Sequence, residues 1–179
     1  MKKVVLVAMS VILACSMLFA LAGCGNSDEK VIRNAMNEQL EAFKNPNSSQ
    51  WQNDFKNELN ELSNMGVDAQ QLVAAWVEGF DYTVGDIKIN GNNATVSITI
   101  KCKQLNPAVD SAVALLENDP ALATMTEAQI IKKYGEALIS ELKKTSPTTT
   151  VITVPCVKSG NTWSEGPGAE NEYYRALLG

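Results

Sequence analysis

Residues 93–103 alternate between apolar and polar side chains without a break, and this pattern constrains the fold more than any other stretch of the chain. Side chains along a strand point alternately to its two faces, so the segment is predicted to be a strand with one buried face. Residues 80–89 would be its hairpin partner, joined through Asn90-Gly91, a pair suited to a type I′ turn. The expected inward residues are Ala94, Val96, Ile98, Ile100 and Cys102, and the expected outward ones are Thr95, Ser97, Thr99, Lys101 and Lys103.

The partner strand changes phase near its middle, because Val84 and Ile87 are three residues apart while the strand period is two. A β-bulge at Gly85-Asp86 would add the residue needed to bring both to one face, with Gly85 in a left-handed conformation. The expected cross-strand pairs are then Ile87 with Ala94, Val84 with Ile98, and Tyr82 with Ile100.

The rest of the chain alternates between helical spacing and a second strand pattern. Its fold class is predicted to be α+β: N-terminal helices packed on a curved antiparallel sheet, with extra helices inserted between strands two and three. Three helices are expected before the hairpin: one over 28–44, one from Ser49 to just before Gly66, and one that starts at Asp68. Three more are expected after it: one from Asn106-Pro107 to near Asp119, one that starts at Thr126, and one over 170–178. The further strands are expected over 148–158 and 162–164.

This order of elements resembles the cystatin-like, nuclear-transport-factor-2-like cone, in which a curved sheet wraps a helix. The likeness is carried by residues 80–103, with Phe80 to Ile87 leading into Asn90 to Val96, and by residues 150–164. In particular, the pattern is similar to small lipoprotein families without an assigned function. The resemblance implies a cavity within the cone.

The N-terminus has the composition of an export signal. Lys2 and Lys3 precede a stretch without charge, and Leu21-Ala22-Gly23-Cys24 resembles the lipobox of bacterial lipoprotein precursors. The resemblance implies cleavage before Cys24 and fatty acids such as palmitate on that cysteine. We expect a signal peptide over 1–23, a lipidated cysteine and short tether over 24–28, and a single extracytoplasmic domain over 29–179. The alternative is an uncleaved membrane-spanning helix, which also places the domain outside the cytoplasm.

Composition excludes several classes of function. The chain contains no histidine, which removes Ser-His-Asp and Cys-His catalysis, most zinc sites and an imidazole pH switch. From Cys24 onward it has 13 Lys and Arg residues against 20 Asp and Glu residues. An acidic chain without basic clusters has no electrostatic footprint for nucleic acid, so no nucleic-acid partner is expected.

Two cysteines, Cys102 and Cys156, remain once Cys15 leaves with the signal peptide and Cys24 is lipidated. Both are predicted to point inward on strands. An even pair in an exported protein indicates a disulfide. The alternative is two separate buried thiols that pack as small apolar groups.

Aromatic side chains are the candidates for a ligand site, because they commonly line small-molecule pockets. Trp51, Trp76, Tyr82 and Trp163 would lie near the mouth of the cone, although their spacing equally fits core packing. The acids considered for a catalytic role are Asp54, Asp81 and Asp86. Alternation turns Asp81 outward, so solvated acids are the better interpretation.

The sequence therefore predicts a lipid-anchored extracytoplasmic domain without catalytic residues, cofactor or metal. Its expected partners are the membrane, through the anchor, and an unknown small molecule or envelope protein. The alternatives are a structural or protein-interaction module of the cell envelope, and a cone-fold enzyme that uses a carboxylate and a tyrosine. A pocket with a trapped small molecule would favour ligand binding, and a filled core with an exposed apolar patch would favour the interaction module. A carboxylate buried at the pocket floor with a raised pKa would favour the enzyme.

Overall fold

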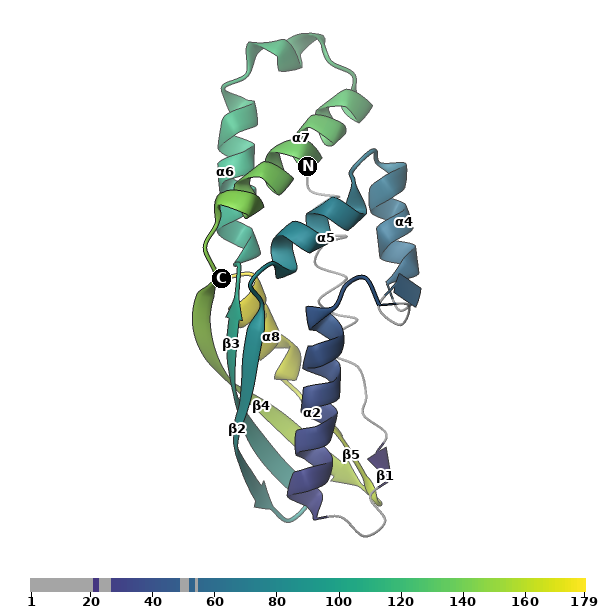
Figure 1. Cartoon of the computed structure of the whole chain (residues 1–179), viewed down its shortest axis with the longest axis vertical. Coiled ribbons are helices and arrows are strands. Elements are labelled where there is room, and N and C mark those ends of the chain that lie inside the picture. Colours follow the sequence, from purple (N-terminus) through teal and green to yellow (C-terminus); the bar gives the residue numbers. More distant parts are fainter. Residues whose placement is uncertain (1–20, 23–26, 49–51, 54) are drawn as a thin grey trace.

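The computed structural model describes residues 21–22, 27–48, 52–53 and 55–179. A curved antiparallel sheet forms one half of an elongated molecule, and a group of helices forms the other half (Figure 1). The strands lie in the order β1-β5-β4-β3-β2. Their bounds are β1 (Leu21–Ala22), β2 (Asp81–Asn90), β3 (Asn93–Cys102), β4 (Thr148–Ser159) and β5 (Thr162–Glu165). The predicted α+β class is confirmed.

The central strands have one buried and one polar face, as the alternation predicts. Ala94, Val96, Ile98, Ile100 and Cys102 of β3 are all buried, whereas Thr95 and Lys101 are exposed. Lys103 departs from the prediction. The strand ends at Cys102, and the Lys103 side chain is only 3% exposed, with its Nζ donating to Glu78 Oε2 at 2.6 Å. The outward orientation predicted for Lys103 assumed that the strand continues past Cys102, and it does not.

The hairpin contains the predicted β-bulge, but its turn differs from the predicted Asn90-Gly91 turn. Val84 pairs with Ile98 and Tyr82 with Ile100, as expected, and the register shifts between Val84 and Ile87. Ile87 lies opposite Val96 rather than Ala94, because Asn90 pairs with Asn93 and the turn residues are Gly91 and Asn92. Gly91 has φ +60° and Asn92 has a negative φ, which fits a type II′ turn rather than type I′.

Gly85 does not have the left-handed backbone expected for it. Its lack of a side chain matters for space instead, since a Cβ there would lie 3.2 Å from the carbonyl oxygen of Ser97 on β3. The two residues Gly85 and Asp86 oppose the single residue Ser97, which is the arrangement of a β-bulge.

The long helix α2 (Asp28–Lys44) packs its apolar face on the inner face of the sheet (Figure 1). Ser27 caps its first turn by accepting a hydrogen bond from the Lys30 amide. At the C-terminus, α8 (Ala169–Leu177) lies along β4 beyond the end of β5. There the Thr153 amide donates to Glu172 Oε2 at 3.0 Å, and Arg175 Nη2 donates to the Val151 carbonyl at 2.8 Å. The helix thus covers backbone groups that would otherwise form an open strand edge.

Four helices and a short 3-10 turn form the other half of the molecule: α4 (Lys56–Asn64), α5 (Ala69–Val77), α6 (Leu105–Glu117), η1 (Pro120–Thr124) and α7 (Glu127–Lys144). The segment α6–η1–α7 lies between β3 and β4, as predicted. Asp68 and Thr126 cap α5 and α7 as their sequence signals indicate. The predicted start at Ser49 lies outside the described residues.

Helix α6 begins earlier than its Asn106-Pro107 signal indicates, with Gln104 as its N-cap. Asn106 is used differently. Its backbone amide donates to the Leu178 carbonyl at 2.9 Å, and its side-chain amide donates to the Gly179 carbonyl at 3.0 Å. These contacts join the start of α6 to the end of the chain.

Candidate functional site

The predicted anchor site lies almost wholly outside the described residues. This holds for Cys24 and for the signal peptide over 1–23, except for Leu21 and Ala22 in β1. These two residues pair with Trp163 and Thr162 of β5. Cleavage before Cys24 would remove β1 and leave a sheet of β5, β4, β3 and β2. Within the described part of the chain, no helix is long and apolar enough to cross a membrane.

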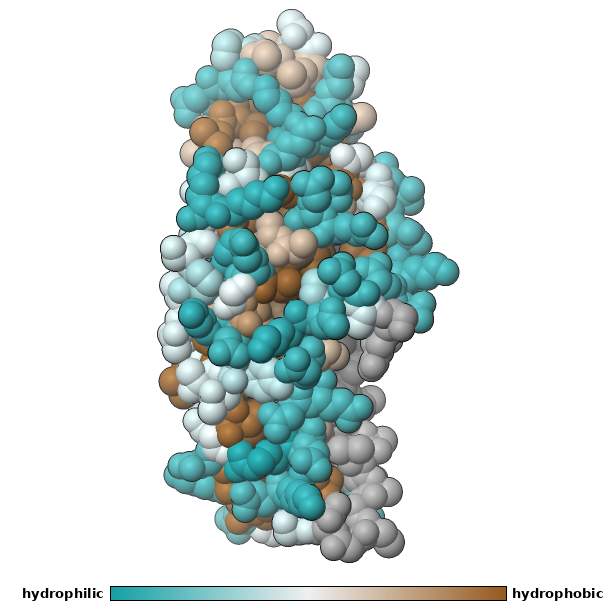
Figure 2. Space-filling model, in the orientation of Figure 1, coloured by the Kyte–Doolittle hydropathy of each residue, from teal (hydrophilic) through white to brown (hydrophobic). Residues whose placement is uncertain are grey.

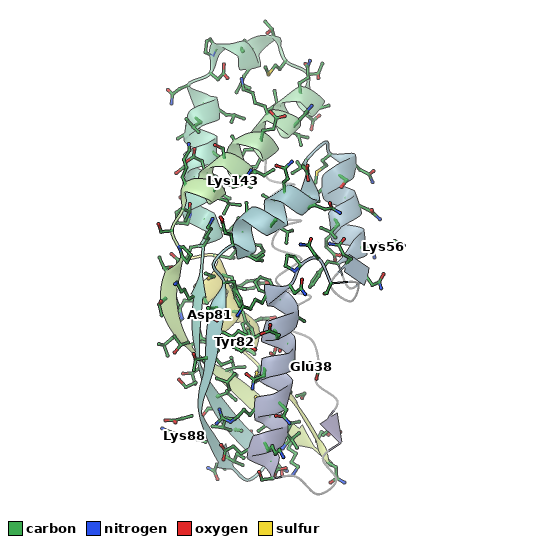
Figure 3. The ribbon with its side chains drawn as sticks, in the orientation of Figure 1. Glu38, Lys56, Asp81, Tyr82, Lys88 and Lys143 are labelled. Carbon is green, nitrogen blue, oxygen red and sulfur yellow. The ribbon has the colours of Figure 1, made fainter. Side chains whose placement is uncertain are left out.

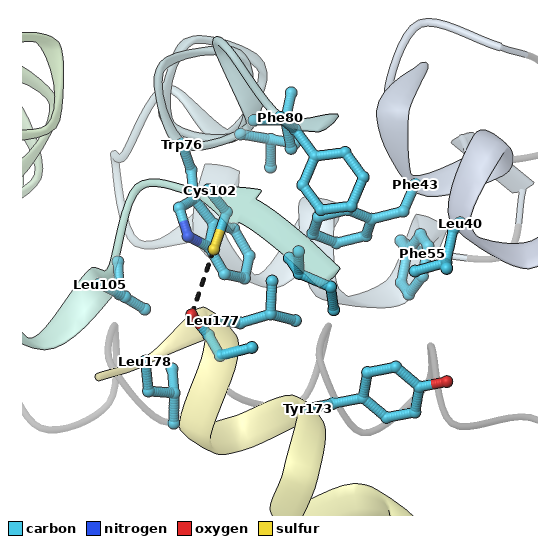
Figure 4. Packing of buried hydrophobic residues seen from close by; sticks show 14 of the residues in the cluster. Leu40, Phe43, Phe55, Trp76, Phe80, Cys102, Leu105, Tyr173, Leu177 and Leu178 are labelled. Atoms are coloured by element: carbon cyan, nitrogen blue, oxygen red, sulfur yellow. Dashed lines mark hydrogen bonds between the residues drawn. The ribbon is translucent and has the colours of Figure 1, made fainter. Parts of the chain in front are cut away.

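The three aromatic candidates that the structure describes, Trp76, Tyr82 and Trp163, do not line a common cavity. Trp76 is 4% exposed and packs in the core, where its ring meets Phe43 edge-on at 5.7 Å between centroids. Its indole N–H donates to the Lys103 carbonyl at 3.0 Å. Figure 4 shows Trp76, Phe43 and Phe80 filling the space beside Leu177 of α8. Trp76 is therefore a core residue.

The other three aromatic candidates have separate surroundings. Trp51 lies outside the described residues. Tyr82 is partly buried on β2, where its hydroxyl donates to the Asn37 carbonyl at 3.0 Å and lies 3.2 Å from Glu41 Oε2. Trp163 is 2% exposed on β5, with the Lys158 ammonium 5.6 Å from its ring centroid.

Side chains of the described residues fill the space between α2, the sheet and α8. The cavity between α2, β3 and α8 has a volume of about 20 Å³, enough for about one water molecule. Its lining residues are Gln39, Leu40, Phe43, Phe80, Ile100, Tyr173 and Leu177. An interior site for a small organic ligand would need several hundred Å³. The cavity implied by the cone resemblance is therefore too small to hold such a ligand.

The cysteines do not form the disulfide that the sequence indicates. Cys102 and Cys156 are both free thiols. Cys102 lies opposite Thr148 and Cys156 lies opposite Ala94, so the two are separated by eight residues along β4, roughly 26 Å. A disulfide requires Cα atoms within about 7 Å. The two thiols share an inward phase but lie near opposite ends of the strand pair.

Burial keeps both thiols protonated. It raises the pKa of Cys102 to about 12, and burial together with the charge of Glu165 raises that of Cys156 to about 12. Because the thiolate is the nucleophile, neither side chain is suited to covalent catalysis. Cys102 Sγ instead donates to the Ala176 carbonyl at 3.1 Å, which Figure 4 marks as a dashed line.

Among the described residues, the carboxyl group whose pKa is most strongly raised belongs to Glu165, which sequence reasoning did not select. Glu165 follows Trp163 by two positions on β5 and therefore shares its inward face, opposite Cys156. Tyr173 donates its hydroxyl to Glu165 Oε1 at 2.9 Å, while Oε2 is buried. Burial raises the pKa of Glu165 to about 7, although hydrogen bonds from Tyr173 and Gln39 act in the opposite direction.

The alternation that identified Trp163 could have identified Glu165 as well. The acids that were considered lie elsewhere. Asp81 is exposed and pairs with Lys44 Nζ at 3.3 Å, a hydrogen bond that lowers the pKa of Asp81. Asp86 is exposed in the bulge, and Asp54 lies outside the described residues. Among the described residues, no group of three His, Cys, Asp or Glu side chains could hold a metal ion.

Two open grooves lie on either side of the segment Gly66–Asp68, which precedes α5. The first, between α4 and α5, has a volume of about 500 Å³. The second, between the start of α5 and α7, has a volume of about 450 Å³. Val67 separates them and packs closely on α7, where a Cβ on Gly135 would lie only 2.8 Å from the Val67 side chain.

Both grooves are lined by a mixture of charged, polar and apolar side chains. The first includes Lys56, Asn60 and Leu59, and the second includes Lys132, Lys143, Glu136, Ile139 and Ser140. Lys56 and Lys143 are labelled in Figure 3. Hydrophilic side chains cover most of the face shown in Figure 2, with hydrophobic ones visible in small areas between them. We call the two depressions the α5 grooves.

Comparison with known proteins assigns neither a family nor a function to the chain. No protein-family model matches the chain, and no curated protein matches it. Among solved structures, the chain is similar to a protein described as a "putative lipoprotein (ycdA)" from Bacillus subtilis, with 15% identity and a TM-score of 0.45. The match covers 90% of this chain and 67% of that one. A likeness of this degree identifies neither a family nor a function.

Proposed function

We propose that the chain is a lipid-anchored extracytoplasmic domain that binds an envelope protein through the α5 grooves. The anchor rests on the Leu21-Ala22-Gly23-Cys24 sequence behind an uncharged stretch. Two acyl chains on Cys24 suffice for stable membrane attachment. The domain acts without catalysis in this proposal.

The observation that carries the binding role is the difference in volume between the interior cavity and the surface grooves of the described residues. The interior cavity of about 20 Å³ holds nothing larger than about one water molecule. The two α5 grooves are open to solvent and have volumes of about 500 and about 450 Å³. Their mixed charged, polar and apolar lining differs from the predominantly apolar lining of a small-molecule pocket, and their open shape supports contact with another protein surface. An envelope protein is therefore a better-supported partner than a small molecule.

Site-specific photocrosslinking in the host tests this role. A photoreactive amino acid at Asn60 or Ser140, exposed residues in the first and second groove, should yield a crosslinked species of defined mass. Thr149, exposed on the outer face of β4, is the control position and should yield none. Equal crosslinking at all three positions, or crosslinking only at Thr149, would contradict the proposal.

A second candidate function is catalysis by Glu165 and Tyr173. A carboxyl whose pKa is about 7, within hydrogen-bond distance of a phenol, has the properties of a general acid–base group. The adjacent cavity is too small for a substrate, so catalysis would require α2 or α8 to move away from the sheet. Activity towards a small substrate that is lost in Glu165→Gln, with the fold intact, would favour this function over partner binding.

A further inference from the structure

The described domain begins close to the anchor residue. Ser27, the N-cap of α2, is only three residues after Cys24. An extended chain spans at most about 3.6 Å per residue, so the two Cα atoms lie within about 11 Å of each other. A lipid on Cys24 therefore holds the first turn of α2 near the membrane surface.

Three segments meet at this end of the molecule, and we call them together the anchor end: residues 27–33, 85–93 and 157–162. Lys158 Nζ lies 2.8 Å from both carboxylate oxygens of Asp28, and the Lys158 amide donates to the Asn92 carbonyl at 2.8 Å. These contacts connect the start of α2 to the β2–β3 and β4–β5 turns, which lie together at the foot of Figure 1. The anchor end is thus a composite surface held by fixed contacts.

The helical half lies at the opposite end of the long axis (Figure 1). β3 runs from the anchor end for ten residues, roughly 30 Å, and α6 continues in the same general direction for 13 residues, roughly 20 Å. The η1 turn that follows α6 is therefore remote from Cys24, and the α5 grooves lie in the same half of the molecule.

Charge is distributed unevenly between the two ends. The anchor end contains four basic and three acidic residues, whereas the rest of the chain from Cys24 onward contains nine basic and 17 acidic residues. The exposed turn residues Gly91, Asn92, Gly160 and Asn161 are uncharged. Two of the four basic side chains at the anchor end are paired with its own acids, Lys158 with Asp28 and Arg33 with Glu29. Anionic lipid headgroups repel acidic surfaces, so they repel the anchor end less than the strongly acidic remainder of the chain.

We propose that the anchor end rests on the headgroups of the bilayer, so that the long axis stands away from the membrane and directs the α5 grooves and η1 outward. This orientation rests on the proposed lipid anchor. It adds that the domain is held upright by a defined surface instead of pivoting freely about its tether.

Fluorescence quenching by lipids with a spin label on the headgroup tests the orientation. One exposed residue at a time is replaced by cysteine: Asn92→Cys or Asn161→Cys at the anchor end, or Ala123→Cys in η1. Each labelled protein, purified in its mature lipidated form from its host, is reconstituted into vesicles with anionic lipid. The parent protein controls for labelling of Cys102 and Cys156, which are 2% exposed.

The proposal expects at least threefold stronger quenching at both anchor-end positions than at Ala123→Cys. Equal quenching at all three positions, in protein that floats with the vesicles, would overturn the upright orientation and leave the anchor intact. Stronger quenching at Ala123→Cys would overturn it in the same way. Protein that fails to float with the vesicles would overturn the anchor, and the orientation with it.

Discussion

Replacing Trp76 with alanine should lower the free energy of unfolding by about 3–5 kcal/mol, the usual effect of removing a buried tryptophan. The side chain is 4% exposed and packs edge-on against Phe43, and its N–H bonds the Lys103 carbonyl. Truncation would leave a cavity between α5, α2 and β3, together with an unpaired carbonyl. Urea denaturation followed by circular dichroism measures the change.

Trp76→Phe is the matched variant, because it keeps an aromatic ring and removes the indole N–H. It should cost much less than the alanine variant, with a hydrogen-bond contribution of about 1 kcal/mol. If Trp76→Ala lowered stability by less than 1 kcal/mol, the side chain would not be a core element. The interpretation of Trp76 as part of a ligand site would then regain support.

The second large effect is a pH dependence that arises from Glu165. The folded protein holds the pKa of this carboxyl at about 7, against 4.5 for an ordinary glutamate. Below about pH 4.5 the group is protonated in both the folded and unfolded states. As the pH rises towards 7 the unfolded chain ionises first, so the folded state loses stability, on the order of 3 kcal/mol in total.

Glu165→Gln removes this titration and should become more stable relative to the wild type as the pH rises from about 4.5 to about 7. The difference between the two proteins should be constant outside that window. Other acids, such as Asp28 with its pKa lowered by Lys158, titrate in both proteins and cancel in the difference. Glu170→Gln, at an exposed position at the start of α8, is the control for the loss of a surface carboxylate.

Denaturation curves measured between pH 4 and pH 8 provide the test. Parallel stability curves for the wild type and Glu165→Gln over this range would show that Glu165 ionises as it does in water. The buried environment assigned to it beside Tyr173 would then be wrong, and the second candidate function would lose its only structural support.

Local signals predicted much of the fold. Thr126 with Gln129, and Asp68 with Gln71, cap α7 and α5 as expected, because an N-cap interaction involves only residues three positions apart. The bulge was also predictable, since Val84 and Ile87 cannot both face inward in a regular strand. The Asn90-Gly91 turn was wrong by one residue, because the register depends on both strands and on the geometry of Gly91.

Long-range contacts account for the errors. The phase of a strand fixes the face to which Cys102 and Cys156 point but not their positions along it, and the register separates them. Asn106 bonds the carbonyls of Leu178 and Gly179, far along the chain, and not the start of its own helix. The cavity implied by the cone resemblance is filled by Phe43, Trp76, Phe80 and residues of α8, which no local pattern predicts.

The candidate site was predicted less well than the fold. The aromatic candidates were selected for a ligand site by residue type alone, whereas their burial depends on how the helices pack on the sheet. Glu165 was missed even though it shares the phase of Trp163, because acidic residues are usually exposed. The α5 grooves depend on how α4, α5 and α7 pack around Val67, and Gly135 permits that approach. No sequence motif marks this arrangement.

The most direct test of the lipid anchor is metabolic labelling with a palmitate analogue in the host cell, combined with membrane fractionation. The wild-type protein is expected to incorporate the label and to sediment with membranes. Cys24→Ala should incorporate none, and should appear in the soluble fraction or as an unprocessed precursor of higher mass. Cys102→Ala, which removes a buried thiol, should keep the label. Unchanged labelling and membrane association of Cys24→Ala would contradict the account.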